Sequence, residues 1–455
     1  MHRLAAGCAA GVALATIWGG AGARAQMAAP AGLNQIETIV VLYMENRSFD
    51  HLFGNFPGAN GLSNAGDAAI QVDADGKPYA ALPDPLDLRK KPPARYEKLP
   101  ASIPNGFFRL DDSYKLSDQL GSLVHAYYQQ QIQIAGGKMN RFAEGSDAQG
   151  YAMGVWDGSS LKMYDYARKY TLADNFFHGA FGGSFLNHIW LVCACAPVYP
   201  NAPAKIVARL DASGKLIEDG FVTPDGYAVN TLEPVGGPFG PETKKERLLP
   251  VQTMATIGDR LSEKNVSWTW YSGGWNEAES GTLKAGAPFS YHHQAFAFFD
   301  RFQKGKPDRA AHLKDLDDML ADIDRGTLPQ VVFYKPRAGV NQHPSNSNVL
   351  SSDAHAADIL ARLEKSPQWA HMAVIVTYDE NGGFWDHVAP PTRDRWGPGT
   401  RVPTIVASPF AKTGFVDHTS YDTTSILSLI ELRHGLAPLT EADAKATPLL
   451  NAFKF

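Results

Sequence analysis

Four short apolar runs, rich in β-branched residues, constrain the fold of this chain more than any other feature. Each has the length of a single strand and carries few polar residues: Ile36–Tyr43, Gln330–Tyr334, Met372–Tyr378 and Val402–Ala407. Runs of this kind are typical of strands that are buried on both faces of a sheet. The sequence therefore predicts a core sheet that is covered on both sides.

Amphipathic helical patterns alternate with these runs. Apolar residues recur at intervals of three and four in Asp315–Ile323, Asp353–Leu363 and Thr424–Leu432, the spacing that forms one apolar helix face. Strands that alternate with helices predict an α/β fold with a largely parallel central sheet flanked by helices. Two stretches rich in Pro and Gly, about 55–110 and 197–250, interrupt the pattern, and we expect them to be loop insertions that form a cap.

The first 25 residues have the pattern of a secretory signal peptide. His2 and Arg3 precede an apolar stretch, and Ala23-Arg24-Ala25 is a small-residue cleavage site. We expect cleavage after Ala25 and a periplasmic or secreted mature chain that forms a single domain, residues 26–455. The alternative, a membrane anchor, is weaker because the apolar stretch is short and broken by glycines.

Composition limits the partners of the chain. With 42 Lys and Arg against 47 Asp and Glu, the net charge at pH 7 is −5, which argues against a general nucleic-acid binder. Beyond the signal peptide, no uncharged run is long enough to cross a bilayer, so we expect no transmembrane segment.

Outside the signal peptide the chain has two cysteines, Cys193 and Cys195. Cysteines two residues apart seldom suit disulfide geometry, so we predict buried thiols on a helix. The alternative, a metal or redox pair, lacks further cysteines or nearby histidine ligands.

Oxygen-bearing side chains follow two of the predicted strands. Glu45 and Asn46 follow the first run, and Asp379 and Glu380 follow the run that ends at Tyr378. In parallel sheets the residues just beyond the carboxyl ends of the strands meet at one edge, where ligands bind. An all-oxygen set suits one hard divalent ion such as Ca²⁺ or Mg²⁺. The alternative is that these residues only cap separate helices.

A candidate nucleophile lies in Gly182-Gly183-Ser184, directly before the apolar helical run Ile189–Ala194. A Gly-Gly-Ser turn that leads into a helix exposes backbone N–H groups, which bind anions. A metal ion beside it could activate the Ser184 hydroxyl. The alternative is an ordinary serine N-cap without chemistry.

Five histidines are candidate proton donors or phosphate ligands: His125, His178, His293, His343 and His387. Histidines 293 and 343 lie in polar loops, which favours a functional role. For each of the five, a structural role as a hydrogen-bonded core residue remains the alternative.

Three segments together resemble the phosphoesterase family, which contains bacterial phospholipases C and Francisella-type acid phosphatases. The segments are Glu45–His51 (ENRSFDH), Thr171–Phe177 (TLADNFF) and Tyr378–Pro391 (YDENGGFWDHVAPP). The resemblance extends from about Glu37 to about Arg433. It implies an alkaline-phosphatase-like core, a metal site at Glu45, Asn46, Asp379 and Glu380, a nucleophile at Ser184, and phosphate-contacting histidines at His125, His293 and His343.

The chain departs from the phospholipases of that family at two positions. Ser184 stands where they usually carry threonine, and Gln131 stands where they tend to have a second histidine. The stretch 124–131 and the Gly-Gly-Ser turn are more similar to the acid phosphatase branch.

We therefore predict an exported acid phosphatase that hydrolyses small phosphate monoesters through a phosphoserine, with His343 as the proton donor. A phospholipase C that acts on phospholipid head groups is the first alternative, and a non-catalytic periplasmic phosphate-binding protein is a distant one. A sulfatase-like relative is disfavoured because Leu186 and His188 stand where the sulfatase motif has proline and arginine.

Overall fold

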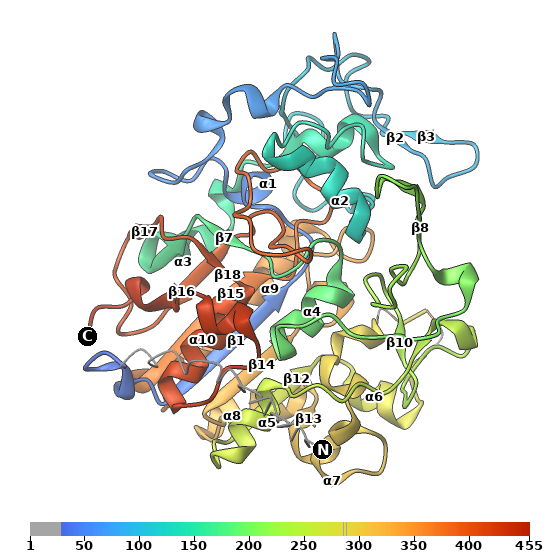
Figure 1. Cartoon of the computed structure of the whole chain (residues 1–455). Coiled ribbons are helices and arrows are strands. Elements are labelled where there is room, and N and C mark those ends of the chain that lie inside the picture. Colours follow the sequence, from blue (N-terminus) through green and yellow to red (C-terminus); the bar gives the residue numbers. More distant parts are fainter. Residues whose placement is uncertain (1–28, 285, 288) are drawn as a thin grey trace, which may run out of the picture.

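An eight-stranded sheet forms the centre of the computed structural model, which describes residues 29–284, 286–287 and 289–455 (Figure 1). In sheet order the strands are β13 (Leu313–Lys314), β12 (Trp268–Ser272), β14 (Val331–Lys335), β1 (Thr38–Met44), β15 (Met372–Tyr378), β16 (Thr404–Ala407), β6 (Thr171–Ala173) and β17 (Phe415–Asp417). Only β16 runs antiparallel to its two neighbours among these paired strands. The predicted α/β class with a largely parallel sheet is confirmed.

The strongest apolar runs form the middle of the sheet. Every residue of β1 and β15 is buried, and β15 coincides with its predicted run. In the parallel register, Ile39 of β1 pairs with Val331 of β14 on one side and with Ala373 of β15 on the other. β12, with the sequence WTWYS, and the three-residue strands β6 and β17 were not predicted, because they carry no β-branched run.

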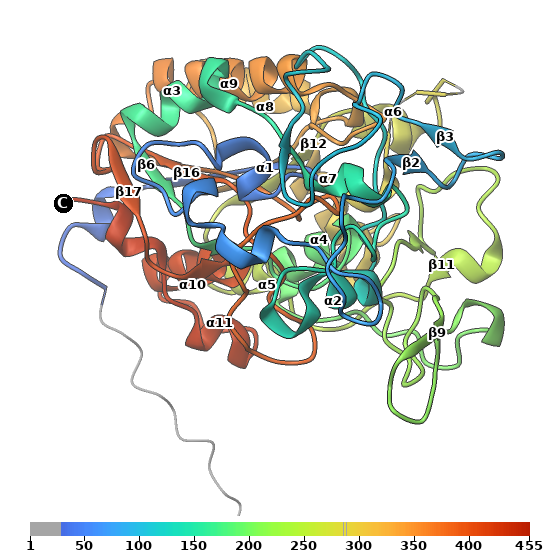
Figure 2. The same cartoon turned by 90° about the horizontal axis from the view of Figure 1, so that it is seen from above.

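Helices cover both faces of the sheet, as the view from above shows (Figure 2). One layer consists of α3 (Lys162–Lys169), α8 (Leu316–Arg325) and α9 (Val349–Lys365), and the other of α4 (Ser184–Cys193), α5 (Ile257–Glu263), α10 (Thr423–His434) and α11 (Glu441–Lys445). The three predicted amphipathic stretches lie in α8, α9 and α10, so those helices are confirmed. The helix after Gly182-Gly183 is confirmed as α4.

The remaining elements are short. The other helices are α1 (Phe49–Phe53), α2 (Tyr127–Ile134), α6 (Trp275–Ser280) and α7 (Pro307–His312). The other strands are β2 (Leu86–Asp87), β3 (Ala94–Arg95), β4 (Phe108–Arg109), β5 (Gly154–Val155), β7 (Phe176–Phe177), β8 (Arg209–Leu210), β9 (Leu216–Glu218), β10 (Glu233–Pro234), β11 (Leu248–Leu249) and β18 (Tyr421–Asp422).

The two Pro- and Gly-rich stretches contain only short elements. Residues 55–110 hold β2, β3 and β4, and residues 197–250 hold β8 to β11. The β2–β3 and β8–β9 hairpins extend towards the same side of the molecule in both views (Figures 1 and 2). Both stretches therefore lie outside the layered core.

The prediction of free thiols is wrong. Cys193 and Cys195 form a disulfide. Helix α4 ends at Cys193, and Ala194 adopts a left-handed conformation (φ 49°) that turns the chain back. The two Cα atoms are then 5.1 Å apart, within the range that a disulfide spans. The part of the prediction that placed Cys193 buried on a helix is correct.

The predicted signal peptide and its cleavage site lie outside the described residues. Within the described ranges, we find no helix with both the length and the apolar character that a membrane crossing requires.

Two carboxyl groups meet between α10 and α11, where Glu431 and Asp443 are both buried. Burial, together with a hydrogen bond to Asp443 and its charge, raises the pKa of Glu431 to about 10. The folded state thus holds a proton that the unfolded chain releases above its ordinary pKa of about 4.3. Stability therefore declines as pH rises between these two values.

We expect Glu431→Gln to remove this decline, because the amide can donate to Asp443 without carrying a titrating proton. Thermal unfolding between pH 5 and pH 9 should show a melting temperature that falls more steeply in the wild type, by about 2 °C or more. Parallel pH profiles for the two proteins would contradict the assignment.

Candidate active site

Three neighbouring strands deliver charged side chains to one point. Glu45 follows the end of β1, Lys335 is the last residue of β14, and Asp379 follows the end of β15. Because these strands are parallel and adjacent, the side chains meet. Lys335 Nζ lies 2.9 Å from Glu45 Oε1 and 3.8 Å from Asp379 Oδ2, and all three side chains are buried.

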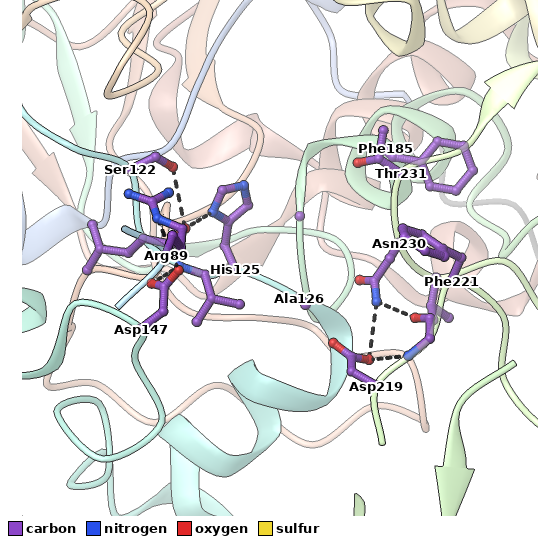
Figure 3. Close-up of a pocket in the computed structure, with 15 residues that line it drawn as sticks. Arg89, Ser122, His125, Ala126, Asp147, Phe185, Asp219, Phe221, Asn230 and Thr231 are labelled. Carbon is purple, nitrogen blue, oxygen red and sulfur yellow. Dashed lines mark hydrogen bonds and ion pairs between the residues drawn. The ribbon is translucent and has the colours of Figure 1, made fainter. Parts of the chain in front are cut away.

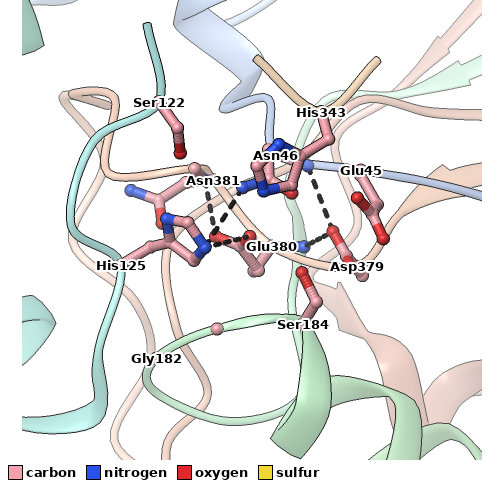
Figure 4. Close-up of polar contacts among 12 residues, drawn as sticks. Glu45, Asn46, Ser122, His125, Gly182, Ser184, His343, Asp379, Glu380 and Asn381 are labelled. Atoms are coloured by element: carbon pink, nitrogen blue, oxygen red, sulfur yellow. Dashed lines mark hydrogen bonds and ion pairs between the residues drawn. The ribbon is translucent and has the colours of Figure 1, made fainter. Parts of the chain in front are cut away.

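Asn46 and Glu380 complete this cluster (Figure 4). Asn46 adopts a left-handed conformation (φ 60°), and its backbone N–H donates to Asp379 Oδ1 at 3.1 Å. The Glu380 N–H donates to the same oxygen at 2.8 Å. Asp379 Oδ1 thus accepts two backbone hydrogen bonds, and Asp379 Oδ2 accepts neither of them.

The cluster fits a cation. Asn46 Oδ1, Asp379 Oδ2 and Glu380 Oε1 are buried, and none of them accepts a hydrogen bond from the described part of the chain. Buried oxygens without partners are costly unless something compensates them. An all-oxygen set suits a hard divalent ion. The structure therefore brings the four predicted ligands together, although their role as ligands remains a proposal.

The charges of the cluster are unbalanced. Burial raises the pKa of Asp379 to about 7, and the Glu45 charge adds to this while Lys335 opposes it. Burial and the Asp379 charge hold the pKa of Glu380 well above its usual value. Burial would also raise the pKa of Glu45, but His293 and Lys335 keep it well below the usual value. A divalent cation would let all three carboxylates ionise.

Ser184 is the first residue of α4, and its buried side chain lies beside Asp379 (Figure 4). The residue that caps the helix is Gly183, so the alternative in which Ser184 is the N-cap is wrong. A side chain at Gly183 would place its Cβ 2.8 Å from the His125 carbonyl oxygen, which explains the glycine. The first N–H groups of α4 and the Ser184 hydroxyl therefore face the same cluster.

Three of the predicted histidines surround the cluster. His125 Nδ1 donates to the Leu123 carbonyl at 2.6 Å, so its Nε2 is the bare nitrogen. That nitrogen lies 3.3 Å from Asn46 Nδ2 and 3.9 Å from Glu380 Oε1. His293 Nε2 contacts Glu45 Oε1, and the His343 ring lies 5.9 Å from the His125 ring.

The other two histidine candidates lie elsewhere. His178 is buried between Gln130 Nε2 at 2.7 Å and Asn187 Oδ1 at 3.3 Å, so it has a structural role. His387 Nδ1 lies 2.6 Å from Asp50 Oδ2, in a separate buried acidic group. The Arg401 guanidinium pairs with that group and fills the position of a cation.

Two residues of the cluster were not predicted. Lys335 follows an apolar strand, as Glu45 does, and that position was the available signal. His188 lies one helical turn after Ser184, on the same face of α4. Its Nδ1 donates to the Ser184 carbonyl at 2.7 Å, and its buried Nε2 has no hydrogen-bond partner within the described ranges. Glu45, His188 and His293 are close enough to share one ion.

The fold and this cluster define an α/β protein with a buried, oxygen-rich group of side chains beside a serine at a helix N-terminus. The chain matches the family model described as "Phosphoesterase family" over residues 36–437, and it belongs to that family. The predicted family is therefore confirmed.

Several relatives are similar over most of the chain. The non-hemolytic phospholipase C of Pseudomonas aeruginosa is 24% identical over 95% of this chain, which spans 59% of that protein. Phospholipase C A of Mycobacterium tuberculosis is 24% identical, with 90% of this chain and 74% of that protein covered. A solved alkaline phosphatase superfamily protein from Vibrio parahaemolyticus is 10% identical, with a TM-score of 0.35 and coverage of 70% and 68%.

Removal of one carboxylate should weaken metal binding. We expect Asp379→Ala to lower the bound divalent metal per chain by about tenfold or more at limiting metal, because ligand charge sets affinity. Metal analysis of purified protein measures this. The exposed acid Asp317 on α8 provides the matched control, Asp317→Ala, which should keep its metal. Full occupancy in Asp379→Ala would remove Asp379 from the ligand set.

Proposed function

We propose that this chain is an exported, metal-dependent hydrolase of phosphate monoesters that uses Ser184 as its nucleophile. The observation that carries the proposal is the position of Ser184 at the N-terminus of α4, beside Asp379 and a cluster of buried oxygens that accept no hydrogen bond within the described part of the chain (Figure 4). Membership of the phosphoesterase family supports the class of reaction. The signal-peptide pattern at the N-terminus supports export.

Glu45, Asn46, Asp379 and Glu380 would hold one divalent ion, such as Ca²⁺ or Mg²⁺. When bound, it would lower the pKa of the serine hydroxyl and polarise a phosphoryl oxygen. Lys335 adds a fixed positive charge at 2.9 Å from Glu45. These charges and the N–H groups of α4 create the environment that a phosphoryl dianion requires.

The proposed reaction has two displacement steps. Ser184 Oγ attacks the phosphorus atom, the bond to the ester oxygen breaks, and the alcohol leaves with a proton. A water molecule then attacks the phosphoserine, which releases inorganic phosphate and restores the Ser184 hydroxyl. A hydroxyl positioned in this way divides one difficult step into two easier ones.

The histidines divide into two roles. Burial lowers the pKa of His125 to about 4, so at neutral pH its bare Nε2 is a hydrogen-bond acceptor rather than a proton donor. Burial also lowers the pKa of His293, although Glu45 opposes this effect. His343 is only partly buried and lies beside His125. We therefore assign His343 as the group that protonates the leaving alcohol.

Replacement of the nucleophile tests the proposal. We expect Ser184→Ala to lose several orders of magnitude in kcat and still to bind inorganic phosphate, because the N–H groups and the cation site remain. Acid quench of the wild type with ³²P-labelled monoester, followed by peptide mapping, should place the label on the peptide that contains Ser184. Label on another residue, or near-normal turnover of Ser184→Ala, would place the nucleophile elsewhere.

The leaving-group role of His343 predicts a dependence on the ester. We expect His343→Gln to slow the hydrolysis of an alkyl phosphate about tenfold or more beyond any slowing of 4-nitrophenyl phosphate hydrolysis. The reason is that nitrophenolate leaves without a proton. Steady-state kinetics with both esters measure the ratio. Equal losses on the two esters would make His343 a phosphate ligand instead of an acid.

A second candidate is a phosphodiesterase of the phospholipase C type. The names of the relatives favour it, since several of them are phospholipases C. Side-by-side assays with 4-nitrophenyl phosphate and with phosphatidylcholine vesicles decide between the two. Release of phosphocholine from vesicles, faster than phosphate from the monoester, would favour the phosphodiesterase.

A further inference from the structure

A cavity of about 400 Å³ adjoins the N-terminus of α4 (Figure 3). Most of its walls come from three parts of the chain: residues 122–126 ahead of α2, Gly183 and Phe185 on either side of Ser184, and residues 219–221 and 229–231 of the second insertion. Arg89 and Asp147 complete the lining. His125 lines this cavity and also faces Asn46 and Glu380. The cavity therefore begins where the proposed phosphoryl site ends.

The wall from the second insertion is held in place by Asn230. The Tyr127 N–H, at the start of α2, donates to Asn230 Oδ1 at 3.2 Å. Asn230 Nδ2 in turn donates to the Gly220 carbonyl at 2.6 Å. The Asn230 side chain thus links the segment that contains Asp219 and Phe221 to helix α2, which follows His125. The cavity belongs to the fold and is not a gap between unattached loops.

The lining combines apolar surface with negative charge. Phe185 and Phe221 supply aromatic rings, and Arg247 packs 3.5 Å from the centre of the Phe221 ring. Asp147 lies on one side of the cavity and Asp219 on the other (Figure 3).

The cation of the lining is neutralised. Arg89 Nε lies 2.9 Å from an Asp87 oxygen and 3.4 Å from an Asp147 oxygen, so its charge is shared by two carboxylates. Asp219 has no basic partner among the described ion pairs. It accepts the Gly220 N–H at 2.8 Å and a longer contact of 3.4 Å from Asn230. Two carboxylates and one cation therefore line the cavity, and Arg247, which contacts the Phe221 ring, is not among the lining residues.

We propose that this cavity is the leaving-group subsite, and that it selects esters of an uncharged, partly apolar alcohol and rejects esters whose alcohol part is anionic. The inference rests on the proposed function, because the alcohol must be attached to a phosphoryl group at Ser184. The rings of Phe185 and Phe221 contact the apolar part of the alcohol. Asp219 supplies the repulsion that excludes a second phosphate or a carboxylate, and so acts as a specificity-determining residue.

Three aryl phosphates that differ in the charge of the para substituent test this inference: phenyl phosphate, 4-carboxyphenyl phosphate and 4-(aminomethyl)phenyl phosphate. Comparison of each ratio between the wild type and the Asp219 variants cancels the differences in substituent size and leaving-group pKa. With the full mature chain and its divalent metal, we expect kcat/KM for the carboxylate ester to be about three- to tenfold lower than for phenyl phosphate, mostly through KM. Asp219→Asn should reduce this gap, and Asp219→Lys should reverse it. For the aminomethyl ester, we expect kcat/KM to change in the opposite direction in both Asp219 variants.

Asp317→Lys is the matched control, since it makes the same charge change on the exposed surface of α8. We expect it to keep the wild-type ratios, which excludes a general effect of net charge. Asp219→Asn keeps the size of the side chain, so it covers the case in which the lysine variant fails to fold. Wild-type ratios in both Asp219 variants would overturn the subsite while the hydrolase remains. Failure to hydrolyse all three esters, with no phosphoserine, would overturn the proposed function and the subsite together.

Discussion

Mutual repulsion between three buried carboxyl groups is the constraint on which the rest of this structure depends. Glu45, Asp379 and Glu380 are fully buried at the ends of adjacent parallel strands. Two unit charges about 4 Å apart interact by about 4 kcal/mol at an effective dielectric constant of 20. Lys335, 2.9 Å from Glu45 and 3.8 Å from Asp379, supplies one compensating charge and no more. Burial raises the pKa of Asp379, and the Glu45 charge adds to this effect. The proposed divalent ion would compensate the remaining charge.

In the second acidic group, the chain itself supplies the compensating cation. Asp50 and Asp386 are also fully buried, but the Arg401 guanidinium lies 3.0 Å and 2.9 Å from them. Asp50 lies shortly after β1 in the sequence, and Asp386 lies shortly after β15. Arg401 therefore connects the two segments that begin with the proposed metal ligands. One acidic group thus has its cation built into the chain and fixes the loops. The other has buried oxygens that accept no hydrogen bond within the described part of the chain, which leaves them available for the proposed cation.

The core of the fold and most of the cluster could be predicted, because buried parallel strands have a recognisable apolar, β-branched sequence. A β-branched run such as Met372–Tyr378 predicts its own strand, and the residue after it is then placed at the sheet edge. Lys335 follows the same logic, but a lone lysine before a proline looks like a turn. His188 becomes visible only when α4 is known to begin at Ser184, which puts residue 188 one turn further on the same face.

The sequence could not predict how segments without hydrophobic periodicity pack. Nothing in the local sequence separates His178 or His387 from His125, because each position depends on where a loop packs. The left-handed turn at Ala194, which brings Cys193 and Cys195 together, is likewise set by the end of a helix and not by cysteine spacing. Single residues in loops are therefore the weakest part of prediction from sequence.

The proposed reaction site and the adjoining cavity are formed mostly by different parts of the chain, and this affects which substrates the chain can accept. The strand ends and α4 carry the cluster and the proposed nucleophile, and the proposed chemistry would serve a phosphate monoester and a diester alike. Most of the walls of the adjoining cavity come from residues 122–126, 219–221 and 229–231, and Asn230 joins them through Tyr127 and Gly220. His125 is the point of contact between the two parts, because it faces Glu380 on one side and lines the cavity on the other. A change in the second insertion can therefore alter which alcohol is accepted without moving any residue that acts on phosphorus. Relatives with the same cluster can then differ in substrate, and their names are a weaker guide to this chain's ester than the charge and shape of its own cavity.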